Sequence, residues 1–148
     1  MYKRILIATD GSELANKGLQ QGLALAAALG SKVDILTVSE PWAMGMYDAM
    51  GWSVGYQATP EYKKEREEAA QAVLKPALEQ AQAAGVSAET VHVLDRYAAD
   101  GIIDTATERG NDLIVMTSHG RRGVSRVLLG SQTAEVLTRS TAPVLVIR

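Results

Sequence analysis

The feature that most constrains the fold is a set of five short apolar runs, most of them rich in β-branched residues. The runs lie at 5–8, 33–38, 91–94, 113–116 and 144–147. Most are nearly continuous rather than alternating with polar residues. That pattern is typical of strands buried on both faces of a parallel sheet. The sequence therefore predicts five buried strands.

Helical patterns fill the gaps between these runs. Apolar residues recur every three or four positions after Ser12, which predicts a helix capped by Ser12 and closed at Gly30. A longer helix is predicted from the cap Thr59 to Gly85, with proline at its first position. Pro76 lies inside this helix and is expected to kink or interrupt it.

Two shorter helices are predicted at 99–109 and 131–139. The residues expected to face inward are Ile102, Ile103 and Ala106 in the first helix and Ala134 and Leu137 in the second. Strands and helices thus alternate along the whole chain. This order predicts one α/β domain over residues 1–148, a doubly wound parallel sheet with right-handed crossovers and helices on both faces.

Composition excludes several classes of protein. The chain has fifteen lysines and arginines and seventeen aspartates and glutamates, and this nearly balanced charge argues against a strongly basic nucleic-acid binder. The chain has no cysteine, so disulfides, thiol catalysis and cysteine-ligated metals are excluded, and its two histidines do not favour a histidine-rich metal site. We find no apolar run long enough for a membrane span and no signal-peptide pattern, so a cytoplasmic location is expected.

Residues that follow the strands are the candidates for chemistry, because open α/β sheets bind ligands at the carboxyl ends of their strands. The first strand is followed by Thr9 and Asp10. The fourth is followed by a glycine-rich and arginine-rich segment containing Gly120, Arg121, Arg122, Gly123, Arg126 and Gly130. A helix opens at Ser131, so the free N–H groups of Ser131, Gln132 and Thr133 favour an anion such as phosphate. The alternative is a glycine loop with solvated arginines and an ordinary serine cap.

Asp10 has several possible roles. Its carboxylate could accept from a ribose hydroxyl or an adenine amine, help to hold a metal, or only cap a turn. A hydrolase triad of Asp10, Ser12 and His119 is not supported, because the chain has no G-x-S-x-G elbow. The P-loop and dinucleotide glycine motifs are also absent. His92 lies within a strand pattern and is interpreted as a packed or surface histidine.

The segment 40–58 is irregular and holds both tryptophans and three of the five methionines. It is interpreted as a loop packed on the sheet rim. A lid over a ligand and a dimer contact are the alternatives.

Taken together, the motifs resemble those of the universal stress protein family. The matching stretches are 2–12, 112–123, 129–131 and 142–148. The family's ATP-binding pattern is G-x-x-G, nine residues, and then G-[ST]. Gly120, Gly130 and Ser131 fit it, whereas Thr117 replaces its first glycine. A positive φ at this position would cost a threonine about 1–2 kcal/mol, whereas extended backbone would accept it without cost.

The resemblance implies a Rossmann-like sheet of strand order 3-2-1-4-5 and an ATP site at the ends of strands 1 and 4. It places Ala8 and Val38 at the adenine, Asp10 at the adenosine, and Met116 and Thr117 at the ribose. The phosphate-binding residues that it implies are Gly120, Arg121, Gly130, Ser131, Gln132 and Thr133. We include the neighbours Thr9 and Gly123 in the predicted site.

The leading functional hypothesis is an ATP-binding, regulatory stress-response protein, with Mg²⁺ as an optional companion of ATP and AMP as an alternative ligand. At most, slow ATP hydrolysis or autophosphorylation is expected. The alternative is a family member that binds no nucleotide and acts through protein contacts alone. An enzyme of a related nucleotidyl-transfer or electron-transfer fold is disfavoured by the missing H-x-G-H motif and the small size. A homodimer is expected through an apolar edge strand made of Val144, Leu145, Val146 and Ile147.

Overall fold

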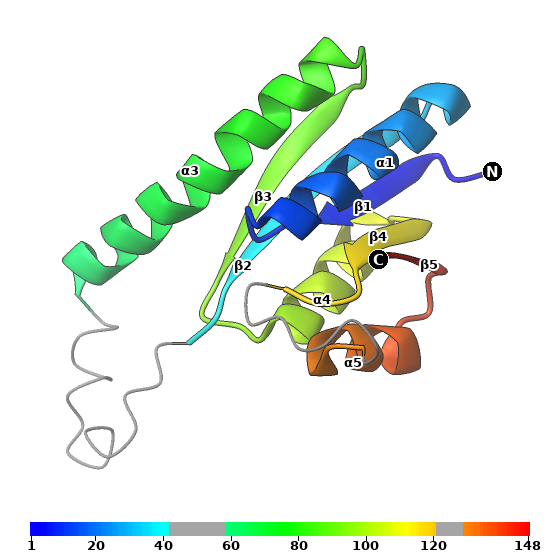
Figure 1. Ribbon diagram of the computed structural model, residues 1–148. Coiled ribbons are helices and arrows are strands. Elements are labelled where there is room, and N and C mark those ends of the chain that lie inside the picture. Colours follow the sequence, from blue (N-terminus) through cyan, green and yellow to red (C-terminus); the bar gives the residue numbers. More distant parts are fainter. Residues whose placement is uncertain (42–58, 121–128) are drawn as a thin grey trace.

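A computed structural model describes residues 1–41, 59–120 and 129–148 and contains a five-stranded parallel sheet (Figure 1). The strands are β1 (Arg4–Ala8), β2 (Lys32–Ser39), β3 (Ala88–Leu94), β4 (Leu113–Thr117) and β5 (Val144–Ile147). Their order across the sheet is β3-β2-β1-β4-β5, as the resemblance implies. The direction of winding reverses between β1 and β4, so a crevice is expected outside the carboxyl ends of these two strands.

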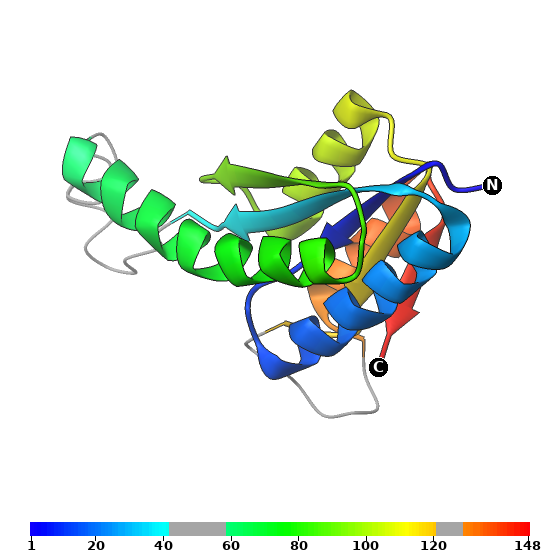
Figure 2. The same cartoon turned by 90° about the horizontal axis from the view of Figure 1, so that it is seen from above.

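Among the described residues, four helices cover the two faces of the sheet. They are α1 (Glu13–Leu29), α3 (Pro60–Ala83), α4 (Ala98–Arg109) and α5 (Ser131–Arg139). In β1, Ile5 and Ile7 pack with residues of α1 and α3, whereas Leu6 packs with residues of α4 and α5. Alternate side chains of one strand therefore pack into two separate hydrophobic cores, one on each face of the sheet. Figure 2 shows α1 and α3 on the face opposite α4.

The helix starts follow the predicted capping chemistry. Ser12 Oγ accepts a hydrogen bond from Ala15 N, and Thr59 Oγ1 accepts one from Tyr62 N. Gly30 ends α1 with a φ of 68°, which glycine adopts without strain. These three predictions are confirmed.

Pro76 is expected to kink or interrupt the helix; it does not interrupt it, because α3 runs from Pro60 to Ala83 as one helix that contains this proline. Leu74, Ala77 and Ala81 are buried on either side of Pro76. Their packing against the sheet compensates for the hydrogen bond that proline cannot donate.

The predicted inner face of α5 is also wrong. Ala134 and Leu137 are exposed, and the buried residues are Thr133 and Val136. The hydroxyl of Thr133 donates to Thr117 O at 2.9 Å, which fixes the rotation of this short helix about its axis. In α4, Ile102 and Ala106 are buried as predicted, but Ile103 is only half-buried.

The third strand begins earlier than its apolar run indicates. It starts at Ala88 and includes Glu89 and Thr90, in register with Val33 to Ile35 of β2. β3 lies at an edge of the sheet, where polar side chains are tolerated, so hydrophobicity alone understates its length.

A buried carboxylate holds the amino-terminal edge of the sheet together. Asp34 of β2 has no exposed side-chain surface and accepts hydrogen bonds from Arg4 Nε at 2.6 Å, Arg109 Nε at 3.0 Å and Asn111 Nδ2 at 2.8 Å. Burial raises the pKa of Asp34, but these donors outweigh burial and lower the pKa to about 2. The charge therefore ties β1, β2 and the end of α4 to one another.

Candidate functional site

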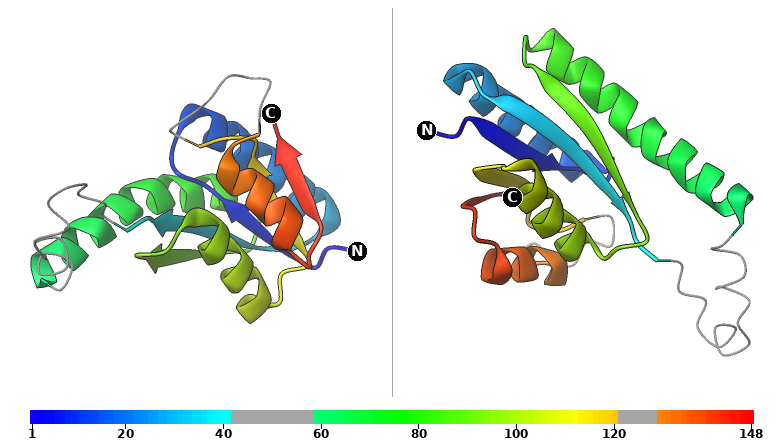
Figure 3. Two further views of the ribbon diagram at one scale, coloured as in Figure 1. Left: turned by 90° about the horizontal axis from the view of Figure 1, so that it is seen from below. Right: turned by 180° about the vertical axis from the view of Figure 1, so that it is seen from behind.

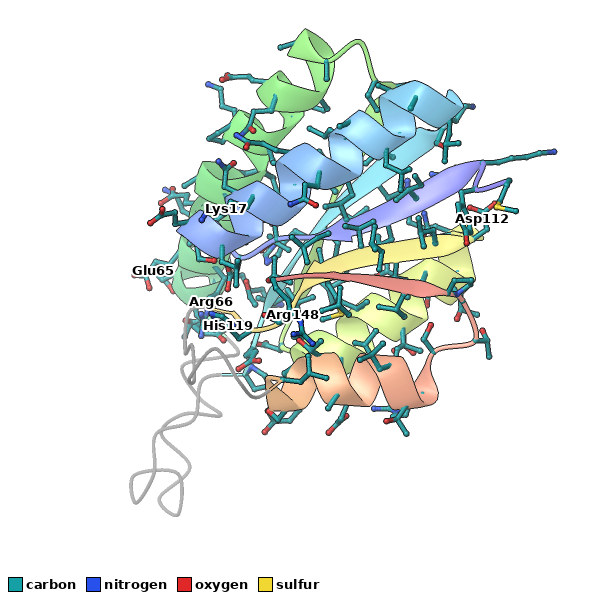
Figure 4. The ribbon with its side chains drawn as sticks, turned by 45° about the vertical axis from the view of Figure 1, so that its right-hand side comes forward. Lys17, Glu65, Arg66, Asp112, His119 and Arg148 are labelled. Carbon is teal, nitrogen blue, oxygen red and sulfur yellow. The ribbon has the colours of Figure 1, made fainter. Side chains whose placement is uncertain are left out.

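A cavity of about 440 Å³ opens at the carboxyl ends of β1 and β4. Its lining includes eleven of the thirteen predicted binding residues: Ala8, Thr9, Asp10, Val38, Met116, Thr117, Gly120, Gly130, Ser131, Gln132 and Thr133. Arg121 and Gly123, the other two, lie outside the described residues. Figure 4 places His119, which also lines the cavity, at the end of the molecule opposite Asp112.

Asp10 combines a turn role with a place in this lining. Its Oδ1 accepts a hydrogen bond from Ser12 N at 2.9 Å, and Gly11 between them has a φ of 77°. A Cβ atom added to Gly120 would lie 2.8 Å from Asp10 Oδ2. A side chain at position 120 would therefore require the carboxylate of Asp10 to shift.

Thr117 is not strained. It is the last residue of β4, and the only non-glycine residues with positive φ among those that the structure describes are Tyr2 and Asp95. Its hydroxyl donates to His119 O at 2.8 Å and so supports the turn that follows the strand. Of the two possibilities raised by the missing glycine, the extended backbone that accepts threonine is the correct one.

The start of α5 presents backbone donors to the cavity. Gly130 is the N-cap residue, and within the described part of the chain no side-chain hydrogen bond caps this helix. Gly130 N itself donates to Ser118 O at 2.8 Å, which anchors the helix start beside the end of β4. Because the hydroxyl of Thr133 is engaged by Thr117 O, Thr133 can offer a ligand its backbone N–H rather than its side chain.

The cavity also has apolar lining residues, most of which sequence reasoning missed. Leu36 and Val38 of β2 line it together with Tyr97, Ala98 and Ile102. Tyr97 is 57% exposed and immediately precedes α4. Tyr97 lies shortly after the end of β3. The expectation that ligands bind at the carboxyl ends of strands would have identified it if it had been applied to β3 as well as to β1 and β4.

Gln132 links the two helices that border the cavity. Its Oε1 accepts a hydrogen bond from Ala99 N, in the first turn of α4, at 2.8 Å. A residue predicted to meet phosphate therefore also positions the amino end of the neighbouring helix.

Other predicted features lie elsewhere. The segment 42–58, which contains the tryptophans and the possible lid, is outside the described residues. His92 is not among the residues that line the cavity and has hydrogen-bond partners of its own. Among residues 1–41, 59–120 and 129–148, no group of three or more His, Cys, Asp or Glu could hold a metal ion. No helix in the same ranges is both long and apolar enough to cross a membrane.

Comparison with known proteins gives a consistent result over the whole chain. The sequence model of the universal stress protein family matches residues 1–148. Universal stress protein YxiE of Bacillus subtilis is 32% identical over 149 residues, covering 100% of both chains. A universal stress protein of Thermus aquaticus is 32% identical over 148 residues, again covering both chains completely.

Solved structures agree with the fold. Protein MJ0577 of Methanocaldococcus jannaschii superposes with a TM-score of 0.81 at 28% identity, covering 99% of this chain and 96% of that one. A universal stress protein solved in complex with cAMP has a TM-score of 0.69 at 27% identity, covering 99% and 97%. The family match, the relatives and the strand order lead to one conclusion: the chain belongs to the universal stress protein family.

Proposed function

We propose that the protein is a regulatory stress-response protein that binds ATP in the cavity at the carboxyl ends of β1 and β4. The observation that carries the proposal is that the cavity lining combines two chemically different sets of residues. Uncapped backbone donors at the start of α5 suit phosphates, and apolar or aromatic lining residues such as Val38 and Tyr97 suit a purine base. The similar universal stress protein that was solved with cAMP supports an adenine nucleotide as the ligand.

The residues present also fit a magnesium ion that arrives with the nucleotide. Magnesium is usually bound by one or two protein carboxylates together with substrate phosphates and water. Among the described lining residues, Asp10 and Glu40 carry carboxylates. When bound, the ion would neutralise phosphate charge, while the described residues would bind and orient the nucleotide.

Calorimetric titration with ATP and with AMP tests the proposal. We expect ATP to bind, and Gly120→Ala to weaken binding at least about tenfold because its Cβ would displace the carboxylate of Asp10. Ser87→Ala, at an exposed position on the amino side of β3, is the matched control and should bind as the natural protein does. No heat of binding at millimolar ATP would reject the proposal and favour a nucleotide-free protein that acts through protein contacts.

We also propose that two copies pair through β5. This strand ends the sheet order, and Figure 3 shows it at the edge beside α5. The carbonyls of Pro143 and Ile147 accept hydrogen bonds from β4, so by alternation Val144 and Val146 direct their backbone groups to the open edge. Leu145, 38% exposed, and Leu137 of α5 add exposed apolar side chains near this edge. Pairing of two such edges would satisfy the free backbone groups.

A further inference from the structure

Three polar side chains form a continuous hydrogen-bonded chain on the face of the sheet that α3 covers. Ser39 is the last residue of β2, His92 lies in β3 and Glu67 lies in α3. His92 Nε2 is 2.8 Å from Ser39 Oγ, and His92 Nδ1 is 2.6 Å from Glu67 Oε2. Because successive residues of a strand point to opposite faces, Ser39 faces away from the cavity that its neighbour Val38 lines.

The partners of His92 define which nitrogen carries its proton. A carboxylate can only accept, so Nδ1 donates to Glu67, and the lone pair of Nε2 is left to accept the hydroxyl proton of Ser39. Gln71 Nε2 donates to Glu67 Oε1 at 2.7 Å. The hydrogen bonds from Gln71 and His92 lower the pKa of Glu67, which keeps its carboxylate ionised near neutral pH.

The imidazole of His92 is nearly buried, and Arg66 contacts the backbone that follows Ser39. The His92 side chain is only 9% exposed. Arg66, which precedes Glu67 in α3, donates from Nη2 to the carbonyl oxygen of Glu40 at 3.3 Å, one residue beyond Ser39. Its guanidinium also lies 5.2 Å from the centre of the Tyr62 ring. Figure 4 shows Arg66 at the same end of the molecule as His119.

From this arrangement we propose a second site, in which Ser39 is the nucleophile of an acyl-transfer reaction on small activated esters. A serine bonded to a histidine that is oriented by a carboxylate is the arrangement that activates a hydroxyl for attack. His92 acts as the general base, and Glu67 is a positioning residue.

The reaction balances without a cofactor. Ser39 Oγ attacks the ester carbonyl carbon and its proton moves to His92 Nε2. The ester C–O bond then breaks, and the leaving alkoxide takes that proton as the alcohol departs. Water, deprotonated by His92, hydrolyses the acyl-serine, which releases the carboxylic acid and restores the Ser39 hydroxyl.

A fluorophosphonate probe tests the site directly, because an activated serine displaces its fluoride and keeps a stable phosphonyl group. The full-length protein is incubated with the probe, digested and analysed by mass spectrometry. We expect the adduct on Ser39, and a labelling rate at least about 100-fold lower in His92→Gln, the lower end of what a general base contributes. Glu67→Gln should lower the rate about tenfold and Glu67→Asp should restore part of it, whereas Glu68→Gln, at an exposed neighbour, should leave it unchanged.

An internal reference makes the result independent of whether the variants fold. Ser118 Oγ lies 3.1 Å from His119 Nδ1 in the same protein, but the described structure shows no carboxylate bonded to that histidine. In the natural protein, Ser39 should therefore be labelled well before Ser118. Absence of an adduct on Ser39, equal labelling of the two serines, or an unchanged rate in folded His92→Gln would overturn the proposal.

Discussion

Asp34 shows how a single residue can make stability depend on pH. Its pKa is about 2 in the folded protein against an ordinary value of 3.8, because two guanidinium groups and an amide favour its charged form. A carboxyl group with a lowered folded pKa contributes stability above its unfolded pKa and loses it as the pH falls through the folded value. The contribution of Asp34 is thus complete above about pH 4 and is lost toward pH 2.

The shift predicts that about 2 kcal/mol of unfolding free energy from Asp34 disappears between pH 4 and pH 2. Urea denaturation of the natural protein and of Asp34→Asn at both pH values measures it. The variant should be less stable at pH 4, because it leaves two arginines poorly paired, and should lose less stability on acidification. Parallel losses in both proteins would show that Asp34 is not the source.

Tyr97 carries a prediction about base recognition that rests on the proposed nucleotide site. If its ring covers the purine, Tyr97→Ala should weaken AMP binding about tenfold, which is about 1.4 kcal/mol, whereas Tyr97→Phe should bind nearly as well. Calorimetry with AMP and with inorganic triphosphate separates base contacts from phosphate contacts. An equal loss for both ligands would contradict a role at the base.

At the scale of elements, α3 contains Pro76, a residue that disfavours helical backbone because it cannot donate a main-chain hydrogen bond. Pro76 is exposed, so its replacement removes no buried contact. Pro76→Ala should raise the unfolding free energy by about 1–3 kcal/mol, because alanine restores a helical donor and relieves the clash with the preceding turn. Chemical denaturation measures this change, and Lys75→Ala, at the exposed neighbour, is the control with little expected effect. A loss of stability in Pro76→Ala would show that proline shapes the α3 surface in a favourable way.

The elements that the sequence predicts well are those whose signals are local. Capping by Ser12 and Thr59, the left-handed glycine at 30 and the buried runs of β1 and β4 depend on residues within one or two turns of each other. The rotation of α5 depends instead on a hydrogen bond between Thr133 and Thr117, sixteen positions apart. Hydrophobic periodicity in a nine-residue helix does not contain that information.

The same distinction applies to the candidate site. The glycines and Asp10 are recognisable because they follow strands, and the cavity lining contains them. The chain of Ser39, His92 and Glu67 is not recognisable, since its members come from three elements and belong to no sequence motif. Only the register of β2 against β3, with Ser39 opposite Leu94, brings the serine within reach of His92.

At the scale of the whole molecule, the open edge of β5 predicts a homodimer. Light scattering at micromolar concentration should give twice the chain mass of 15.8 kDa. Val146→Pro should shift the mass to that of the monomer, because it removes a donor that faces the open edge and not the ladder to β4. Leu145→Lys, which changes only an exposed side chain of the strand, is the companion variant and should also weaken pairing. A monomeric natural protein would reject this assembly.

The hydrogen bond between Gly130 N and Ser118 O has a consequence for engineering and for divergence within the family. It joins Ser118 and Gly130, which flank the stretch 119–129, at a separation of 2.8 Å, so the framework holds both attachment points together. Doubling the number of residues between two such fixed points costs only about 0.6 kcal/mol in closure entropy. Segments of different length and charge can therefore replace the residues between Gly120 and Gly130 with little loss of stability. Such replacements would alter the ligand preference of the cavity.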